Sequence, residues 1–272
     1  MDGLPARGTA VRSLGLELPP ARMPGWRGTR PLKRWRYVGV YTPQLMLCVG
    51  DARIAGVPQR WWAVALPDGT LAERTTIRRG GVSIEGSRVR VRAPDVEIEL
   101  ELKEGDTVEV VSAAGENYVW TAKQAAITVR GFATLSGERF DIDSDSAFID
   151  DSAGYHLRHT AWRWSAGVGR TDDGRRVGWN LVTGLHDSEP AGERTVWVDG
   201  EPRPVGPQEF AEDLSAVGGL RFTEWSAREE NANFVVMRSR YRQPFGTFEG
   251  ELPGGLRLTE GYGVMEEHDV RW

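Results

Sequence analysis

The sequence predicts an all-β protein, and three observations lead to that class. Short runs in which apolar and polar residues alternate follow one another from about residue 32 to the end of the chain, as in half-buried strands. Glycine, with 33 residues, and proline, with 15, break these runs often, which is typical of a fold with many turns. Helical periodicity is scarce, and the best helix candidate, residues 207–219, is short.

The composition is that of an ordinary globular chain. The 272 residues are 40% hydrophobic and 27% charged, which excludes a disordered protein. The net charge is −5 and the arginines are spread along the chain, so nucleic acid is not an expected partner. The first twenty residues lack the apolar run of a signal peptide, and no stretch reaches the ~20 apolar residues of a membrane helix. We therefore expect a cytoplasmic protein without stable membrane insertion.

Three segments follow one another along the chain. Residues 1–30 are rich in proline and predict an extended arm laid over the body. Residues 31–148 and 149–272 predict an N-terminal and a C-terminal β half. The acidic segment 141–154 divides the chain near its middle and is interpreted as a solvated linker.

Residues 88–102 predict a hairpin with a defined register. Valines alternate with arginines before Pro94-Asp95, and aliphatic residues alternate with glutamates after it. An antiparallel pairing that sets Arg92 opposite Glu97 gives one face of opposite charges and one aliphatic face. A slip of one residue would bury the charges, so the register is well specified.

Residues 155–187 predict a second hairpin, with Asp173-Gly174 as a two-residue turn. This turn sets Trp164 opposite Thr183 and Val168 opposite Trp179. The residues then expected on one face of the sheet are His156, Arg158, Thr160, Trp162, Trp164 and Trp179. His159, Arg163 and Asn180 are expected on the other face.

The tryptophans are the main indication of function. A buried tryptophan removes ~150–250 Å² from water, which at ~25 cal/mol per Å² corresponds to about 4–6 kcal/mol. A core can be built more simply from aliphatic residues. Tryptophans at strand positions therefore suggest either a large packed core or the wall of a cavity for an apolar ligand. The expected ligand-binding residues are Trp62, Arg158, Trp162, Trp164, Trp179 and Asn180.

Candidate acids lie beside the tryptophan-rich strand. Asp150 and Asp151 precede it, where loss of water would raise the pKa of a carboxyl group and let it act as an acid near neutral pH. His156 is a further candidate. Glu266, Glu267 and His268 form a second candidate group near the C-terminus, from which Glu267 and His268 are taken as site residues. The alternative for this group is a hydrogen-bonded clasp at the end of a strand, with Trp272 packed against it.

Cofactor and metal sites are not expected. On a strand, His156 and His159 point to opposite faces and cannot share a metal ion. The sequence has no phosphate-binding loop, dinucleotide fingerprint or hydrolase motif. Cys48, the single cysteine, lies in an apolar run and is interpreted as a small core residue.

Several segments resemble one family of bacterial proteins, DUF2804. They are "DDSAGYHLRHTAWRWSAGVG", "GRRVGWNLVTG", "VWVDG" and the ending "GYGVMEEHDVRW", and "PLKRWRYVGVYT" also fits. The resemblance covers residues 31–272 and extends to the lipocalin-like (calycin) proteins, which include carotenoid hydratases, tocopherol cyclase and AttH-type proteins. It implies two tandem lipocalin-like antiparallel β-barrel or sandwich halves, with a ligand cavity within or between them.

Three hypotheses about function follow. Because related proteins mostly act on polyenes, terpenoids or polyketides without a redox cofactor, the resemblance implies a cofactor-independent hydratase, cyclase or isomerase. A non-catalytic carrier of a lipid or isoprenoid needs the same apolar wall but no acid, and a filled core needs no cavity. An ionisable group with a perturbed pKa inside the cavity favours the enzyme, whereas the lack of any cavity of about 300 Å³ would exclude the first two hypotheses.

Overall fold

The computed structural model describes residues 3–77, 80–189, 191–234 and 237–271. Within these ranges strands dominate, and the single helix is the short 3-10 helix η1 (Gly8–Leu14). The all-β prediction is confirmed. The predicted helix at 207–219 is wrong, because Phe210 forms a β-bridge with Val217 and the segment folds back through a turn. Its apolar residues Leu214 and Val217 reach the core by that turn instead of by a helical stripe.

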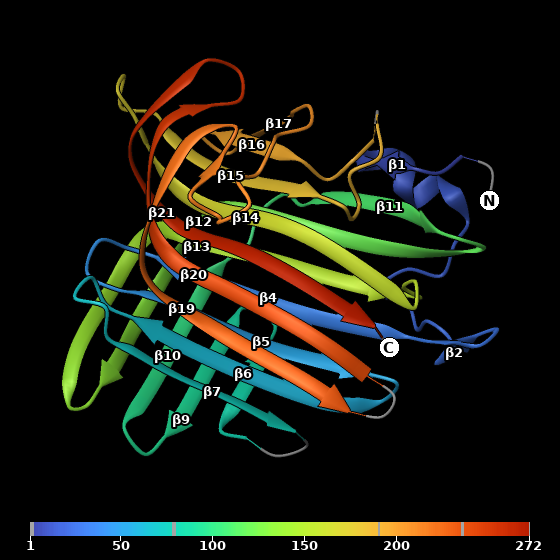
Figure 1. The fold of residues 1–272 in the computed structure, drawn as a ribbon, viewed down its shortest axis with the longest axis horizontal. Coiled ribbons are helices and arrows are strands. Elements are labelled where there is room, and N and C mark those ends of the chain that lie inside the picture. Colours follow the sequence, from blue (N-terminus) through green and yellow to red (C-terminus); the bar gives the residue numbers. More distant parts are fainter. Residues whose placement is uncertain (1–2, 78–79, 190, 235–236, 272) are drawn as a thin grey trace.

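Two large antiparallel sheets make up the molecule (Figure 1). In the first sheet the strand order is β7 (Leu71–Ile77), β6 (Val57–Ala65), β5 (Met46–Ile54), β4 (Lys33–Tyr41), β13 (Glu138–Gly154), β12 (Asn117–Leu135), β10 (Val96–Lys103), β9 (Arg88–Ala93) and β8 (Val82–Glu85). β11 (Val108–Ala114) also pairs with β12, and β1 (Ala6–Arg7) pairs with β11.

The second sheet contains the C-terminal strands. Its order is β17 (Glu201–Pro204), β16 (Thr195–Val198), β15 (Arg176–Thr183), β14 (His159–Thr171), β21 (Leu256–Arg271), β20 (Met237–Leu252), β19 (Gly219–Phe234) and β18 (Ala216–Val217). A small ribbon of β2 (Trp26–Arg27) and β3 (Arg30–Pro31) lies at the edge of the molecule.

Each sheet curls around its own apolar interior. Val38, Leu47, Trp62 and Ile98 belong to the interior of the first sheet, and Trp179, Leu181 and Phe248 belong to that of the second. A third cluster joins residues of both sheets, including Tyr37, Phe148, Trp164 and Phe245. In Figure 1 the orange and red strands β19, β20 and β21 accordingly cross in front of the blue and cyan strands β4 to β6. The two sheets therefore pack against each other through faces that are apolar as well.

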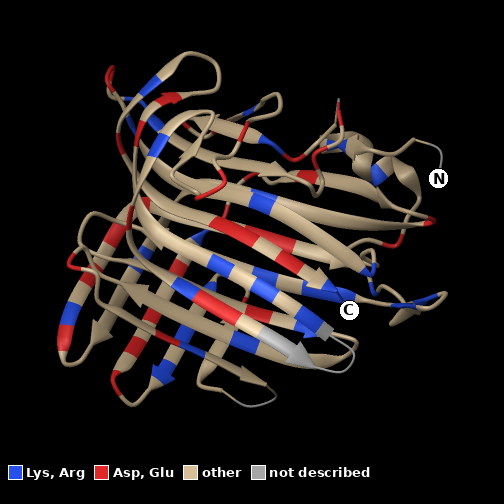
Figure 2. Cartoon of the chain, viewed as in Figure 1, with Lys and Arg blue, Asp and Glu red and all other residues tan. Residues whose placement is uncertain are grey.

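The first hairpin has the predicted register. Arg92 pairs with Glu97 and Arg88 with Glu101 across β9 and β10, and Val89, Val91 and Ile98 are buried on the other face. In Figure 2 blue bands alternate with tan along β9, and red bands alternate with tan along β10. One face meets water and the other meets the core, so the pattern of charges specified the pairing.

The predicted register of the second hairpin is wrong by one residue. Gly167 pairs with Trp179 and Trp164 with Val182, because the turn contains three residues instead of two. The Thr171 N–H bonds the Arg175 carbonyl, and Gly174 between them has φ +82°, as in a three-residue hairpin loop. Trp179 therefore lies on the face opposite to Trp164, and Asn180 lies on the same face as Trp164.

The N-terminal arm is laid over the body and is partly structured. Val11 of η1, with Leu18 and Met23, packs against Tyr118 and Trp120 of β12. The Arg7 guanidinium also donates to Thr195 Oγ1 of β16 at 2.7 Å. The arm thus contacts both sheets.

The acidic segment is not a linker. Residues 141–154 belong to the long strand β13, which pairs with both β12 and β4. Asp141 and Asp143 are exposed and Ile142 between them is buried, which is the alternation of an amphipathic strand. The chain leaves the first sheet at Gly154 and enters the second at His159. We therefore propose residues 155–158 as the division between the halves, in place of residues 148 and 149.

Candidate functional site

A cavity of about 220 Å³ lies between the two sheets. Its walls come from β4, β5, β6, β12 and β13 on one side and from β14, β15, β19, β20 and β21 on the other. At about 30 Å³ per water molecule it has room for about seven waters. It is smaller than the ~300 Å³ that was set above as the minimum for a ligand cavity, so it does not meet that criterion. Any molecule that binds here has to be smaller than a drug-sized ligand.

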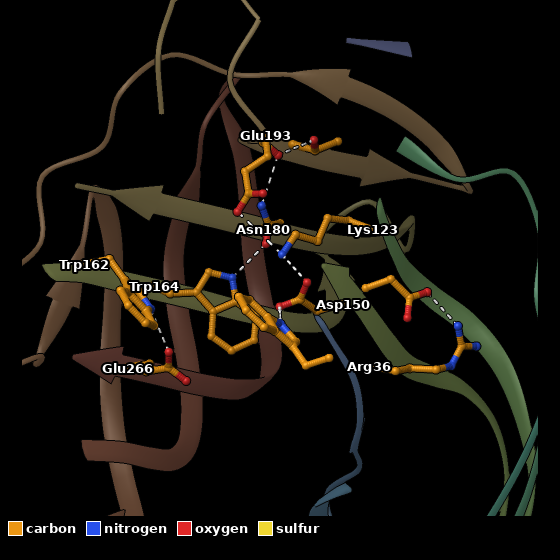
Figure 3. A network of polar contacts seen from close by, with 11 residues as sticks. Arg36, Lys123, Asp150, Trp162, Trp164, Asn180, Glu193 and Glu266 are labelled. Carbon is orange, nitrogen blue, oxygen red and sulfur yellow. Dashed lines mark hydrogen bonds and ion pairs between the residues drawn. The ribbon is translucent and has the colours of Figure 1, made fainter. Parts of the chain in front are cut away.

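Tryptophans form much of the wall. Trp35 and Trp61 come from the first sheet, and Trp162 and Trp164 come from β14 of the second. Because side chains alternate along a strand, Thr160, Trp162 and Trp164 share the face that meets the cavity. The Trp164 indole donates to Asn180 Oδ1 at 2.7 Å, which fixes its orientation (Figure 3).

Glu266 places a carboxyl group against this wall. Its oxygens accept hydrogen bonds from Trp162 Nε1 at 2.8 Å, from Gln243 Nε2 at 2.9 Å and from the Tyr241 hydroxyl at 3.2 Å. Burial disfavours the charged form and raises the pKa of Glu266 to about 7, although the Trp162 and Tyr241 hydrogen bonds act in the opposite direction. Near neutral pH this group can both donate and accept a proton.

Other cavity residues near Glu266 have defined partners and protonation states. Burial raises the pKa of Tyr241 well above its usual value, so its hydroxyl stays a donor. The buried Arg228 guanidinium donates to Glu73 Oε2 at 2.8 Å. His268 packs against the Trp162 ring with 4.5 Å between centroids, and burial lowers its pKa to about 4. His268 is therefore a neutral imidazole at physiological pH.

A second polar group meets the cavity from the first sheet. Lys123 Nζ lies 2.5 Å from Asp150 Oδ1 and 3.5 Å from Glu193 Oε1 (Figure 3). Burial lowers the Lys123 pKa, but the two carboxylates outweigh it and the pKa ends above its usual value. His156 and His186 adjoin this ion cluster, with 6.0 Å between their ring centroids. We call Thr121, Lys123, Asp150, His156, His186 and Glu193 the Lys123 end of the cavity.

The structure brings together five of the predicted site residues. They all line the cavity and are Asp150, His156, Trp162, Trp164 and His268. Asn180 lies behind Trp164 and bonds the Glu193 carbonyl oxygen at 3.0 Å, so it supports the wall from outside the lining.

The other predicted site residues lie elsewhere. Trp62 belongs to the filled interior of the first sheet and Trp179 to that of the second. Arg158 is exposed on the connection before β14. Asp151 faces away from Asp150 and pairs with Arg36 at 2.6 Å, although burial raises its pKa to about 6.

Glu267 lies outside the cavity lining as well. It pairs with Arg163 at 3.0 Å and with Arg240 at 3.2 Å. Its neighbours Glu266 and His268 point the other way, into the cavity. Within the C-terminal candidate group the acid was assigned to Glu267, and the geometry favours Glu266, another member of that group, instead.

Sequence reasoning missed several residues of the site. Trp61 lines the cavity where Trp62 was expected. Lys123 in "WTAKQAAITV" carries a weak signal, because it is the single charge in this otherwise uncharged run of strand residues. Arg228 and Glu193 give no such signal, since only the fold shows that they are buried.

No cluster of metal-ligating side chains is found among the residues that the structure describes. In the same part of the chain, no helix has the length and apolar character to cross a membrane.

Comparisons with known proteins place this chain in a family. The sequence profile of DUF2804, a domain of unknown function, matches residues 51–272. The chain belongs to the DUF2804 family. No curated protein sequence matches it.

Several solved structures are similar to this DUF2804 protein. A crystal structure of a candidate AttH from Nitrosomonas europaea superposes with a TM-score of 0.56 at 16% identity, covering 92% of this chain and 97% of the other. Kievitone hydratase from Nectria haematococca gives a TM-score of 0.47 at 10% identity, covering 86% and 88% of the two chains. CghA gives 0.47 at 10%, covering 92% and 93%.

The AttH likeness shows the fold alone. It covers nearly all of both chains, so it extends over both curled sheets of this DUF2804 protein. The prediction of two tandem lipocalin-like halves is therefore confirmed.

Proposed function

We propose that this protein is a cofactor-independent enzyme that adds water to, cyclises or isomerises a compact unsaturated molecule. One observation carries the proposal: the Glu266 carboxyl group is buried against a tryptophan wall and has a pKa of about 7. A carrier needs the apolar wall but no acid inside it. Titratable groups with shifted pKa values that meet in a cavity are a typical feature of catalytic sites.

The proposed reaction begins with proton transfer from Glu266 to a carbon of a double bond. The substrate becomes a cation, and Glu266 becomes a carboxylate. The π faces of Trp162 and Trp164 attract the positive charge. The hydrogen bonds from Trp162, Tyr241 and Gln243 stabilise the carboxylate that remains.

The cation can then be discharged in two ways. Loss of a proton to Glu266 gives an isomer, or a cyclic product if a second double bond has attacked the cation first. Attack by water, followed by loss of one water proton to Glu266, gives the hydrated product. Both routes return Glu266 to its protonated form, so neither consumes a cofactor.

Deuterium incorporation tests this proposal. The protein is incubated in D2O with a panel of small terpenoid alkenes and dienes, and recovered compounds are analysed by mass spectrometry. We expect carbon-bound deuterium, in substrate or product, with at least one compound. Glu266→Gln should abolish it, because an amide has no acidic proton to donate.

Glu267→Gln is the matched control. It changes the adjacent residue in the same way but outside the cavity, so it should incorporate deuterium at the wild-type rate. Equal incorporation by Glu266→Gln and wild type would refute the role of Glu266. Tight binding of a panel compound without any incorporation would favour the carrier.

A further inference from the structure

We propose that the Lys123 end of the cavity is a hydroxyl-binding site, and that the substrate is therefore an unsaturated alcohol or phenol. The inference deepens the proposed function and rests on it only in taking the cavity as the substrate site.

Unpaired polar atoms concentrate at this end. Thr121 Oγ1, His156 Nε2, His186 Nε2 and Glu193 Oε2 are buried and have no hydrogen-bond partner among the described residues. The four residues are 1%, 6%, 8% and 2% exposed, respectively, and all of them line the cavity. A buried polar group without a partner costs about 1–3 kcal/mol. Water in the cavity can bond these atoms when no ligand is present. A ligand that displaces this water must therefore replace its hydrogen bonds, and a ligand group that cannot do so leaves the atoms unpaired at that cost.

The charges at this end argue against an anionic ligand group. Lys123 is already flanked by two carboxylates, Asp150 and Glu193. Burial lowers the pKa of His186 to about 3 and that of His156 well below its usual value, so both imidazoles are neutral. The Arg7 guanidinium also acts on Glu193, so the charges of Lys123, Arg7, Asp150 and Glu193 sum to zero. An added anion would therefore be buried without a net positive charge to offset it.

The same charges argue against a cationic ligand group. A ligand ammonium would lie beside the Lys123 ammonium, which already pairs with both carboxylates, Asp150 and Glu193. Burying like charges next to each other costs free energy at low dielectric. The ligand group that suits this end is therefore neutral and can both donate and accept a hydrogen bond.

A hydroxyl group meets that requirement. Its hydrogen can be donated to Glu193 Oε2, which is an acceptor only. Its oxygen can accept from a neutral imidazole N–H of His156 or His186, or from the Thr121 hydroxyl. A ligand methyl group of the same size can do neither and would leave the four atoms unpaired.

One small molecule can contact both ends of the cavity. The Lys123 end lies on β12, β13, the connection 155–158 and the loop before β16, and Glu266 lies on β21 of the facing sheet. The charge of Asp150 also contributes to the raised pKa of Glu266. The tryptophan wall lies in the same cavity and would hold the apolar body.

A matched pair of probes tests the proposal. 2-Naphthol and 2-methylnaphthalene have the same ring system and nearly the same shape, and differ only in the hydroxyl group. Equilibrium dialysis measures the dissociation constant of each. We expect the wild-type protein to bind 2-naphthol at least tenfold more tightly.

Two variants test whether the preference for 2-naphthol over 2-methylnaphthalene depends on the Lys123 end. Glu193→Gln and His186→Phe should each reduce the preference for 2-naphthol by at least fivefold, while 2-methylnaphthalene binds within twofold of wild type. Its unchanged binding shows that the variant is folded with an intact cavity. Glu189→Gln changes an exposed side chain of the same loop that pairs with the buried Arg194. A glutamine oxygen can still accept from Arg194 and Glu189 lies outside the cavity lining, so this variant should keep the full preference.

Three outcomes would overturn the proposal. They are equal binding of the two probes by the wild type, tighter binding of 2-(aminomethyl)naphthalene than of 2-naphthol, and a preference that survives in both variants. These outcomes are separable from the role of Glu266. Deuterium incorporation with no hydroxyl preference would overturn this inference alone, and the preference without incorporation would overturn the acid role alone.

Discussion

Replacing Glu266 by glutamine should change how stability depends on pH. The folded protein raises the pKa of this carboxyl group from 4.5 to about 7. One pKa unit corresponds to about 1.4 kcal/mol, so this rise corresponds to about 3 kcal/mol. Glu266 is 8% exposed, so screening by solvent reduces this value little.

The sign follows from proton binding. Between pH 4.5 and 7 the folded protein holds a proton on Glu266 that the unfolded chain has lost. The free energy of unfolding therefore falls as pH rises through this range. The contribution is fully present below pH 4.5 and is lost above pH 7. A glutamine holds no such proton, so its contribution does not change with pH.

Urea unfolding followed by tryptophan fluorescence measures the effect. We expect the free energy of unfolding of Glu266→Gln, relative to wild type, to increase by about 3 kcal/mol between pH 4.5 and pH 8. Glu267→Gln, which removes a carboxylate paired with Arg163 and Arg240, should show no such increase. A pH-independent difference between Glu266→Gln and wild type would refute the reasoning, because it would mean that Glu266 titrates alike in the folded and unfolded states.

Two further predictions concern the cavity walls. Lys123→Met leaves Asp150 and Glu193 without their shared counter-charge. It should lower the free energy of unfolding by about 3–5 kcal/mol in urea unfolding, and a loss of less than about 1 kcal/mol would contradict this. Trp164→Phe and Trp179→Phe each remove one buried indole hydrogen bond and should each cost about 1–3 kcal/mol in urea unfolding. Trp164→Phe alone should weaken 2-naphthol binding in equilibrium dialysis, because Trp179 lies on the other face of the sheet; equal weakening by both would contradict the assignment of faces.

The sequence predicted the strands better than it predicted their faces. The hairpin at 88–102 was correct to the residue, because its arginines and glutamates can only face water. At the second hairpin both faces are apolar, since one meets the other half and the opposite one fills an interior. The hydrophobic pattern of such a hairpin does not specify its register. The extra loop residue therefore places Trp179 and Asn180 on faces of the sheet opposite to those predicted.

The same uncertainty about which face of a strand meets the cavity explains the other incorrectly predicted site residues. Trp61 and Trp62 are adjacent on β6, and so are Glu266 and Glu267 on β21. In each pair one residue faces the cavity and its neighbour does not. Choosing between them requires the packing of one half on the other, which joins residues far apart in the sequence. The contact between Lys123 and Glu193 depends on that packing in the same way.

A crystal structure with 6-bromo-2-naphthol tests the central claim most directly. The anomalous signal of bromine locates one end of the probe, and the electron density locates its hydroxyl group. We predict bromine among the tryptophans beside Glu266 and the hydroxyl oxygen within hydrogen-bond distance of Glu193. Bromine within either filled interior or only on the outer surface, with the space between the halves unoccupied by the probe, would contradict the account.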